Sequence, residues 1–178
     1  LIKEAQNNTE ILFKFRDSIY HNHRDYWFKT RAYTHAFACN KIYKRKVFKD
    51  LRYPIGKKFE DVWLLPNIIQ QCQTIATTAF GYYHYYYNPH GITATADGKA
   101  LQDLLNAHLK AFKQYQNADY YLSILNVQID VYNQLKAPIL LPYKQYWTSF
   151  KLVLVSCLGV KTTCKIMNLL YKWRQRNR

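Results

Sequence analysis

The stretch Asn40-Lys41-Ile42-Tyr43-Lys44-Arg45, followed fifteen residues later by Glu60-Asp61, carries most of the fold information in this sequence. The basic residues come at the end of segment 36–43, which is rich in residues that pack on a sheet and is expected to form a strand. The acidic pair comes before an apolar segment, and we expect a helix from Asp61 to about Gln73, capped by the Asp61 carboxylate. A carboxylate placed there, behind a basic cluster, suits a catalytic base beside a negatively charged ligand.

From Ala38 to Thr95 the chain resembles the acceptor-side, second half of the catalytic domain of family 2, GT-A-type bacterial glycosyltransferases. Three segments carry the resemblance, and they are specific as an ordered set. They are Cys39-Asn40-Lys41-Ile42-Tyr43-Lys44-Arg45, Arg52-Tyr53-Pro54-Ile55-Gly56-Lys57-Lys58-Phe59-Glu60-Asp61 and Gly81-Tyr82-Tyr83-His84-Tyr85-Tyr86-Tyr87-Asn88-Pro89-His90-Gly91-Ile92-Thr93. The fold class that the resemblance implies is α/β, a partial GT-A fold of a few strands with packed helices.

The resemblance implies an inverting enzyme of polysaccharide biosynthesis. It would move a sugar from a nucleotide-sugar to a lipid-linked or surface-polysaccharide acceptor. In that family the aspartate of the acidic pair is the catalytic base, a role that the match places on Asp61, with Glu60 as its neighbour. The alternative for Asp61 is a helix cap and nothing more.

The substrate-binding candidates are Asn40, Lys41, Lys44, Arg45 and Trp63. The three basic side chains suit the phosphate groups of a nucleotide-sugar or of a lipid diphosphate. A solvated basic strand edge explains the same residues equally well.

The intact enzyme is expected to use a divalent cation, Mn²⁺ or Mg²⁺. In the resembled family this ion and the nucleotide are bound by an Asp-x-Asp motif in a nucleotide-binding half that precedes the matched segment. This sequence contains no Asp-x-Asp, and only residues 1–37 precede the match. We therefore expect the chain alone to bind no metal and to be inactive, while His84 or His90 remains a candidate for a further metal ligand or a surface histidine.

Composition places the chain among folded, cytosolic proteins. At 178 residues, 49% of them hydrophobic, it can bury one sizeable core, and disorder is excluded. Its four cysteines lack CxxC or zinc-ligand spacing, which is typical of reduced thiols. There is no signal-peptide pattern, no apolar run reaches the roughly 20 residues of a membrane span, and a first residue other than methionine suggests a piece of a longer protein.

The charge is uneven and points to an anionic partner. The formal net charge is +15, and the segment 143–178 contains no acidic residue. We divide the chain into 1–142, the acceptor-side half, and 143–178, a basic amphipathic helical extension. On a helical projection Lys161, Lys165, Lys172 and Arg176 fall within roughly 60°, with Ile166, Leu169, Leu170 and Trp173 on another side. This pattern predicts contact of Lys161, Lys165, Lys172, Trp173 and Arg176 with an anionic membrane, peripherally at the inner face of the cell membrane. The alternative is a helix packed on its own domain with a solvated basic face.

The remaining periodicity predicts a mostly helical protein. Helices are expected over 4–20, 99–116 and 119–135, with a short helix at 44–48. A loop is expected from His21 to Lys29, turns at 53–56 and 88–91, and one or two strands over 74–87, broken at Gly81. A linker is bracketed by Pro138 and Pro142.

Two other function classes fit parts of the sequence. A basic, tyrosine-rich chain is typical of a non-enzymatic nucleic-acid-binding protein that stacks bases on aromatic rings. That reading leaves the order of basic strand, turn and acidic pair unexplained, and we expect no nucleic-acid partner. The other alternative is a catalytically dead, glycosyltransferase-like partner, which a retained Asp-x-Asp in the complete protein would argue against.

Overall fold

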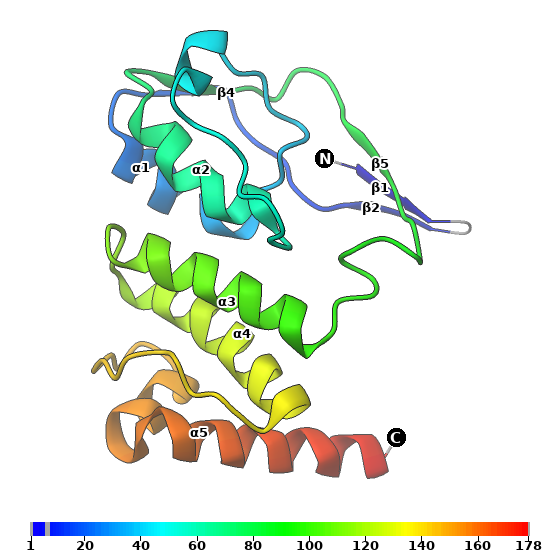
Figure 1. Cartoon of the computed structure of the whole chain (residues 1–178), viewed down its shortest axis with the longest axis vertical. Helices are drawn as coiled ribbons and strands as arrows, with labels where there is room; N and C mark the ends of the chain where they lie inside the picture. Colours follow the sequence, from blue (N-terminus) through cyan, green and yellow to red (C-terminus); the bar gives the residue numbers. More distant parts are fainter. Residues whose placement is uncertain (1, 6–7, 178) are drawn as a thin grey trace. The chain divides into compact units, whose positions relative to one another are not determined.

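The computed structural model describes residues 2–5 and 8–177, which fold into two compact units (Figure 1). The first unit is Leu1–Thr95 and the second is Ala96–Arg178. The units therefore separate between 95 and 96, whereas the sequence placed its division between 142 and 143, inside the second unit.

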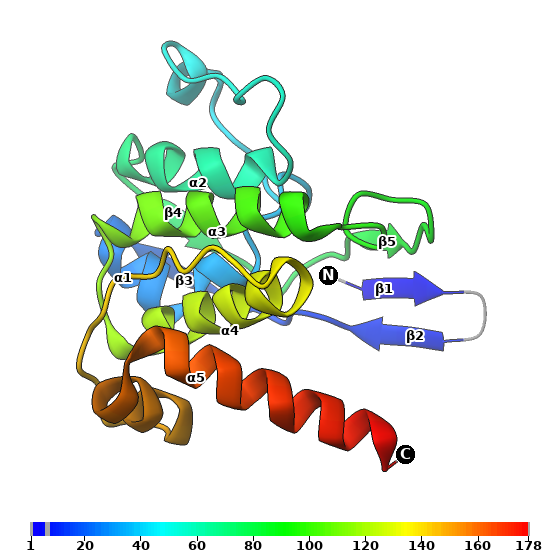
Figure 2. The ribbon, with the colours of Figure 1, turned by 60° about the horizontal axis from the view of Figure 1, so that its bottom comes forward.

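Short strands form two small sheets in the first unit. Strand β1 (Ile2–Ala5) pairs antiparallel with β2 (Asn8–Ile11) and parallel with β5 (His84–Tyr86), in the order β2-β1-β5. Strand β3 (Ser18–Tyr20) pairs antiparallel with β4 (Ile75–Thr77). The three-stranded sheet stands to one side of the helices of this unit in Figures 1 and 2.

The helix expected over 4–20 is wrong in the described residues, since they form strands and irregular backbone. The spacing of Ile11, Phe15 and Ile19 suits a helix, but Ile19 instead pairs with Ala76 of β4. Pairing with strands more than fifty residues away overrides a local periodicity that is weak evidence by itself. The predicted strands over 74–87 are confirmed as β4 and β5. The predicted break at Gly81 lies between them, where this residue has a φ of 88°.

Helix α1 (His23–Lys29) stands where the sequence indicated a loop. The Asn22 side chain accepts a 2.8 Å hydrogen bond from the backbone N–H of Arg24, which caps the helix. Its inner face buries Tyr26 and Trp27. The aromatic residues were read as loop-like, but they form the packed side of a short capped helix.

The strand expected over 36–43 is also wrong, because this segment is an irregular loop. It follows a 3₁₀ turn, η1 (Ala32–Thr34), and leads to a second one, η2 (Arg45–Phe48), which confirms the predicted short helix. Asn40 has a left-handed backbone with φ of 57°, which a strand does not allow. The segment therefore reverses direction instead of running along a sheet.

Helix α2 (Glu60–Gln70) confirms the helix predicted behind the acidic pair, and it ends three residues earlier than expected. The preceding turn is confirmed as well, with Gly56 in a left-handed conformation. The N-cap is Phe59, also left-handed, so Asp61 lies in the first turn instead of at the cap. The inner face of α2 contributes Leu64 and Ile68 to a cluster with Val47 of η2.

The described residues of the second unit form three helices, each beginning at a capping side chain. Helices α3 (Gly98–Phe112) and α4 (Ala118–Leu135) lie side by side, and α4 packs on α5 (Phe150–Arg176) (Figures 1 and 2). Asp97, Asn117 and Ser149 accept hydrogen bonds from the first turns of these helices. The predicted helices 99–116 and 119–135 are therefore confirmed.

Hydrogen bonds from the fully buried side chain of Gln128 hold the linker after α4 against that helix. Its amide nitrogen donates to the carbonyl oxygen of Pro138 at 2.9 Å. Its carbonyl oxygen accepts from the backbone N–H groups of Leu140 and Leu141 at 2.7 and 3.0 Å. One side chain thus satisfies three backbone groups that an irregular segment would otherwise leave unpaired.

Helix α5 is divided by Gly159, whose φ of 77° and ψ of 166° are not helical. Within the described residues, α5 alone is long and apolar enough to cross a membrane by length and composition, and one third of its apolar window is buried in the protein. This helix lies within segment 143–178, where a helical extension was expected, and lysines interrupt its apolar residues. The protein is mostly helical with a few short strands, as predicted, whereas the GT-A arrangement itself stays a prediction.

Candidate functional site

The Asp61 carboxylate occupies the first turn of α2 and links it to the loop before η2. One of its oxygens, Oδ1, accepts a 2.8 Å hydrogen bond from the backbone N–H of Val62. The backbone N–H of Ala38 also donates to this carboxylate. Both bonds hold a half-buried negative charge at the positive end of the helix dipole. The carboxylate is therefore fixed in position by backbone groups and not by a flexible partner.

The pKa of Asp61 is raised above its ordinary value, chiefly because burial disfavours the charged carboxylate. Neighbouring Glu60 raises this pKa further. The N–H groups of Val62 and Ala38 and the charge of Lys41 lower it. A carboxylate with a raised pKa is a stronger base than a free aspartate, which is the property that proton abstraction from a hydroxyl requires.

Lys41 is committed to internal contacts, unlike the phosphate-binding lysine that the sequence suggested. Its ammonium group donates to the carbonyl oxygens of His35 and Phe37 at 2.8 and 2.7 Å, and to Oδ1 of Asn40 at 2.9 Å. An ammonium has three protons, so these bonds use all of them. Burial lowers the pKa of Lys41 to about 8, while Cys39 and Asp61 raise it. Lys41 therefore shapes the loop beside Asp61.

The loop that Lys41 organises rests on a buried histidine that the sequence analysis did not single out. His35 is 1% exposed, and its ring contacts the rings of Phe13 and Phe15, each at 5.0 Å between centroids. Its Nε2 lies 2.9 Å from the carbonyl oxygen of Thr30. Burial lowers the pKa of His35 to about 4, so the ring is neutral at physiological pH. No local pattern in the sequence marks it, because its aromatic partners come from an irregular segment.

Lys44 and Arg45 differ from Lys41, since both side chains are exposed. Lys44 lines a cavity of about 570 Å³ together with Asn40, Lys41 and Lys46. Apolar residues of α2, among them Leu65, Ile68 and Ile69, also line this cavity. Neither Glu60 nor Asp61 lines this cavity. The structure therefore brings part of the substrate-binding set together, but in a hollow that the acidic pair does not reach.

Arg45 borders a second, shallower hollow of about 400 Å³ with Lys49 and Arg52. Arg52 is held by the end of η2, because its guanidinium donates to the carbonyl oxygens of Phe48, Lys49 and Leu51 at 2.5, 3.3 and 2.7 Å. Arg52 belongs to segment 52–61, one of the three segments that carry the resemblance. A basic residue one turn after a short helix is a known signal for such capping.

Trp63, the last of the substrate-binding candidates, is half-buried on α2. The Lys57 ammonium lies 5.7 Å from the centre of its ring, within the range of a cation–π interaction. This contact joins the turn before α2 to the helix itself.

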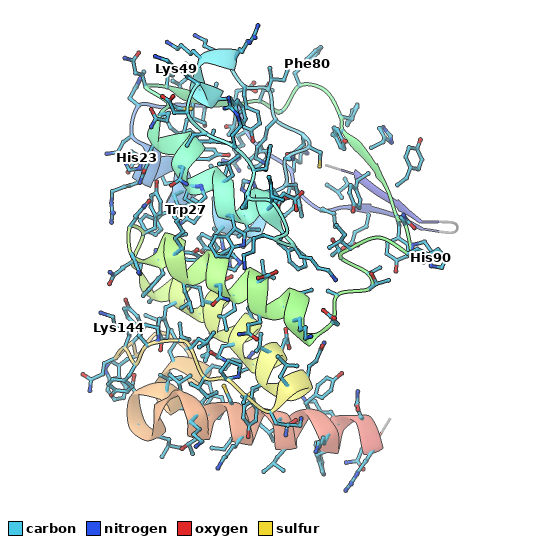
Figure 3. The ribbon with its side chains drawn as sticks, viewed as in Figure 1. His23, Trp27, Lys49, Phe80, His90 and Lys144 are labelled. Atoms are coloured by element: carbon cyan, nitrogen blue, oxygen red, sulfur yellow. The ribbon has the colours of Figure 1, made fainter. Side chains whose placement is uncertain are left out.

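The two metal-ligand candidates belong to different elements of the first unit. His84 is exposed on β5, with its ring 6.4 Å from that of Tyr82. His90 is exposed in the loop after β5, beside the three-stranded sheet, whereas Trp27 lies among the helices of the same unit (Figure 3). Among the residues that the structure describes, no three His, Cys, Asp or Glu side chains could hold a metal ion together. The residues present therefore do not fit the divalent cation that the resemblance implies.

The membrane-contact candidates all belong to the second unit. The residues of this set lie on α5 beyond its kink, and all of them are exposed: Lys161, Lys165, Lys172, Trp173 and Arg176.

Comparison with known proteins adds no relative to this picture. No protein-family model matches the chain, and neither a characterised protein nor a solved structure is significantly similar to it.

Proposed function

We propose that this chain provides the acceptor side of an inverting glycosyltransferase in which Asp61 is the general base. The observation that carries the proposal is the carboxylate itself. It is half-buried at the start of α2, it is held by two backbone N–H groups, and its pKa is raised by burial. The resemblance of segments 39–45, 52–61 and 81–93 supports the same role for the same residue.

In this mechanism the acceptor hydroxyl approaches the Asp61 carboxylate and gives up its proton to it. The hydroxyl oxygen attacks the anomeric carbon of the donor from the face opposite the nucleotide. The new carbon–oxygen bond forms as the bond to the nucleotide phosphate breaks, so the configuration at that carbon inverts. The nucleotide diphosphate leaves with the bonding electrons. General base catalysis of this kind contributes about 10²- to 10⁴-fold to the rate.

The other residues of the site serve the base or the substrate. Lys41 keeps the loop from His35 to Asn40 in place beside Asp61. Lys44, with its exposed ammonium, is our candidate for contact with a phosphate group of the substrate. As the resemblance implies, we propose that the donor nucleotide is held by a donor-binding half that is not part of this sequence.

The experiment is a sugar-transfer assay with this chain joined to the donor-binding half of a family 2 glycosyltransferase. Labelled UDP- and GDP-sugars serve as donors, and a bacterial lipid extract supplies the acceptor. Transfer that Asp61→Asn removes supports the proposal. The matched control is Asp50→Asn, the same chemical change at an exposed aspartate, which should retain transfer. Transfer that survives in Asp61→Asn contradicts the role of Asp61.

The main competitor is a catalytically dead relative that only binds an active partner. It predicts no transfer from any donor in the same assay, and it also predicts that Asp61→Asn leaves partner binding unchanged.

A further inference from the structure

One apolar side of helix α5 is buried by packing within the second unit. Beyond the kink, Val160, Thr163 and Cys164 are buried, and Cys164 is completely inaccessible. Before the kink, Leu152 and Val155 are buried in the same way. Packing on its own unit therefore accounts for one side of each segment of the helix.

A second apolar side of the segment after the kink remains exposed. Leu169 is 64%, Leu170 41% and Trp173 63% exposed. At 100° per residue these three side chains, with Ile166, lie about 80° to 180° around the helix from Val160, the middle of the buried side. A helix that only packs on its own unit would carry polar residues at these positions. Isolated apolar residues on a surface are ordinary, but a continuous stripe along one helix needs a partner.

Basic residues run directly beside the apolar stripe. Lys161, Lys165, Lys172 and Arg176 are all exposed and lie on the side of the stripe away from Leu170. No acidic residue occurs between 143 and 178, so nothing in this segment neutralises them. Whatever covers the stripe must therefore be apolar in its interior and negatively charged at its surface.

The segment before the kink extends the same kind of surface. Phe150 is 68% exposed, on the side of the helix opposite Leu152 and Val155, and Leu158, which is 48% exposed, lies between that side and the buried one. Trp147, just before the helix begins, is 62% exposed. Tryptophan and phenylalanine favour the boundary between water and lipid acyl chains.

We propose that α5 is an interfacial anchor that lies in the plane of an anionic lipid surface. Leu169, Trp173 and Phe150 would insert into the lipid acyl region. Lys161, Lys165 and Lys172 would contact the anionic headgroups. A surface position is favoured over a membrane span because Gly159 interrupts the helix. Lys165 and Lys172 would also fall inside the hydrocarbon of a span, where a charge is costly. Membrane binding by α5 requires neither Asp61 nor sugar transfer, so it is independent of the proposed function.

The test is flotation of the full chain with vesicles of phosphatidylcholine, alone or mixed with phosphatidylglycerol. We expect binding to the mixed vesicles only, and weaker binding as salt rises, because salt screens exposed charges. The triple variant Lys161→Gln, Lys165→Gln, Lys172→Gln should lose on the order of 100-fold in affinity, at about fivefold for each lysine near the surface. The control carries the same charge change at exposed lysines outside α5: Lys14→Gln, Lys99→Gln and Lys113→Gln.

A second variant tests the apolar stripe without changing charge. Leu169→Gln with Trp173→Gln replaces side chains that are mostly exposed, so the fold should persist, as circular dichroism would verify. We expect this variant to lose binding, and the tryptophan emission of the unmodified chain, but not that of the variant, to shift to shorter wavelength on mixed vesicles.

Several outcomes would overturn the proposal. Equal losses in the α5 and control triple variants would show that total charge, not this helix, drives binding. Resistance of the bound chain to alkaline extraction would indicate a membrane span. Absence of vesicle binding, with a dimer in light scattering that Leu169→Gln and Trp173→Gln dissociate, would assign the stripe to a second copy of the chain.

Discussion

Replacing Lys41 with methionine should destabilise the first unit, although sequence reasoning made this residue a substrate contact. The substitution keeps the length and apolar stem of the side chain and removes the ammonium. It therefore deletes the bonds to the carbonyl oxygens of His35 and Phe37 and to the Asn40 side chain, which are 2.7 to 2.9 Å long. One hydrogen bond to a charged group contributes about 1.5–3 kcal/mol, and such contributions are not additive. Because burial of the ammonium offsets part of this gain, we expect a loss of about 2–3 kcal/mol in the free energy of unfolding.

The assay is urea unfolding followed by tryptophan fluorescence. Trp147→Phe and Trp173→Phe in the background leave Trp27 and Trp63, both in the first unit, as reporters. Lys44→Met is the matched control, because Lys44 is exposed three residues further along the same loop, and it should change stability by less than about 0.5 kcal/mol. If Lys41→Met were as stable as the Lys44→Met control, the three internal bonds would have no structural role and our account of the loop would be wrong.

Three further predictions concern the second unit and the donor. Gln128→Leu leaves three backbone groups of the linker unpaired, so we expect a loss of about 3 kcal/mol or more in thermal unfolding, and a smaller loss in Gln128→Glu, which keeps an acceptor for Leu140 and Leu141. His108 is buried and its pKa is lowered to about 4 from 6.5, so the stability it contributes is complete above pH 6.5 and is lost as pH falls towards 4, at up to about 1.4 kcal/mol per pH unit. In urea unfolding between pH 4 and 6.5, the free energy of unfolding should change less with pH for His108→Gln than for the exposed control His21→Gln. Equal pH dependence in the two variants would refute the lowered pKa of His108. Finally, calorimetry of this chain with UDP- and GDP-sugars and Mn²⁺ should detect no tight binding, and a micromolar dissociation constant would contradict the absence of a donor site.

Local signals were sufficient where the decisive interactions are local. Helices α3 and α4 each have a clear apolar stripe, and this periodicity was sufficient to predict them. The capping residues Asp97 and Asn117 are a further local signal for where they begin. Turn chemistry located the turn at Gly56, and the acidic pair before an apolar segment located helix α2.

Local signals failed where distant contacts decide the backbone. Strand β3 pairs with β4, which lies more than fifty residues later in the chain. No local sequence pattern predicts this pairing. The segment 36–43 has strand-like composition, yet the left-handed Asn40 and the Lys41 ammonium bend it into a loop. A single sequence does not show which lysine turns inward, because Lys41 and Lys44 have the same chemistry.

The candidate site was predictable in position and not in detail. The acidic pair lies at the start of a helix as expected, with Asp61 two positions beyond the N-cap residue Phe59. The sequence did not indicate that Asp61 is tied to Ala38, since that bond depends on the loop fold. Nor did it reveal that α5 has two apolar sides, because only the structure shows which of them is buried.

The most direct test of the central claim is the turnover of Asp61→Asn in the protein joined to a donor-binding half. Asparagine keeps the shape of the side chain and can still accept from the Val62 N–H, but it cannot take a proton from the acceptor. We predict that turnover falls by about 10²-fold or more while donor binding is unchanged, the scale expected for loss of a general base. Near-normal turnover in Asp61→Asn, with the variant folded and Asp50→Asn fully active, would contradict the assignment of Asp61 as the base.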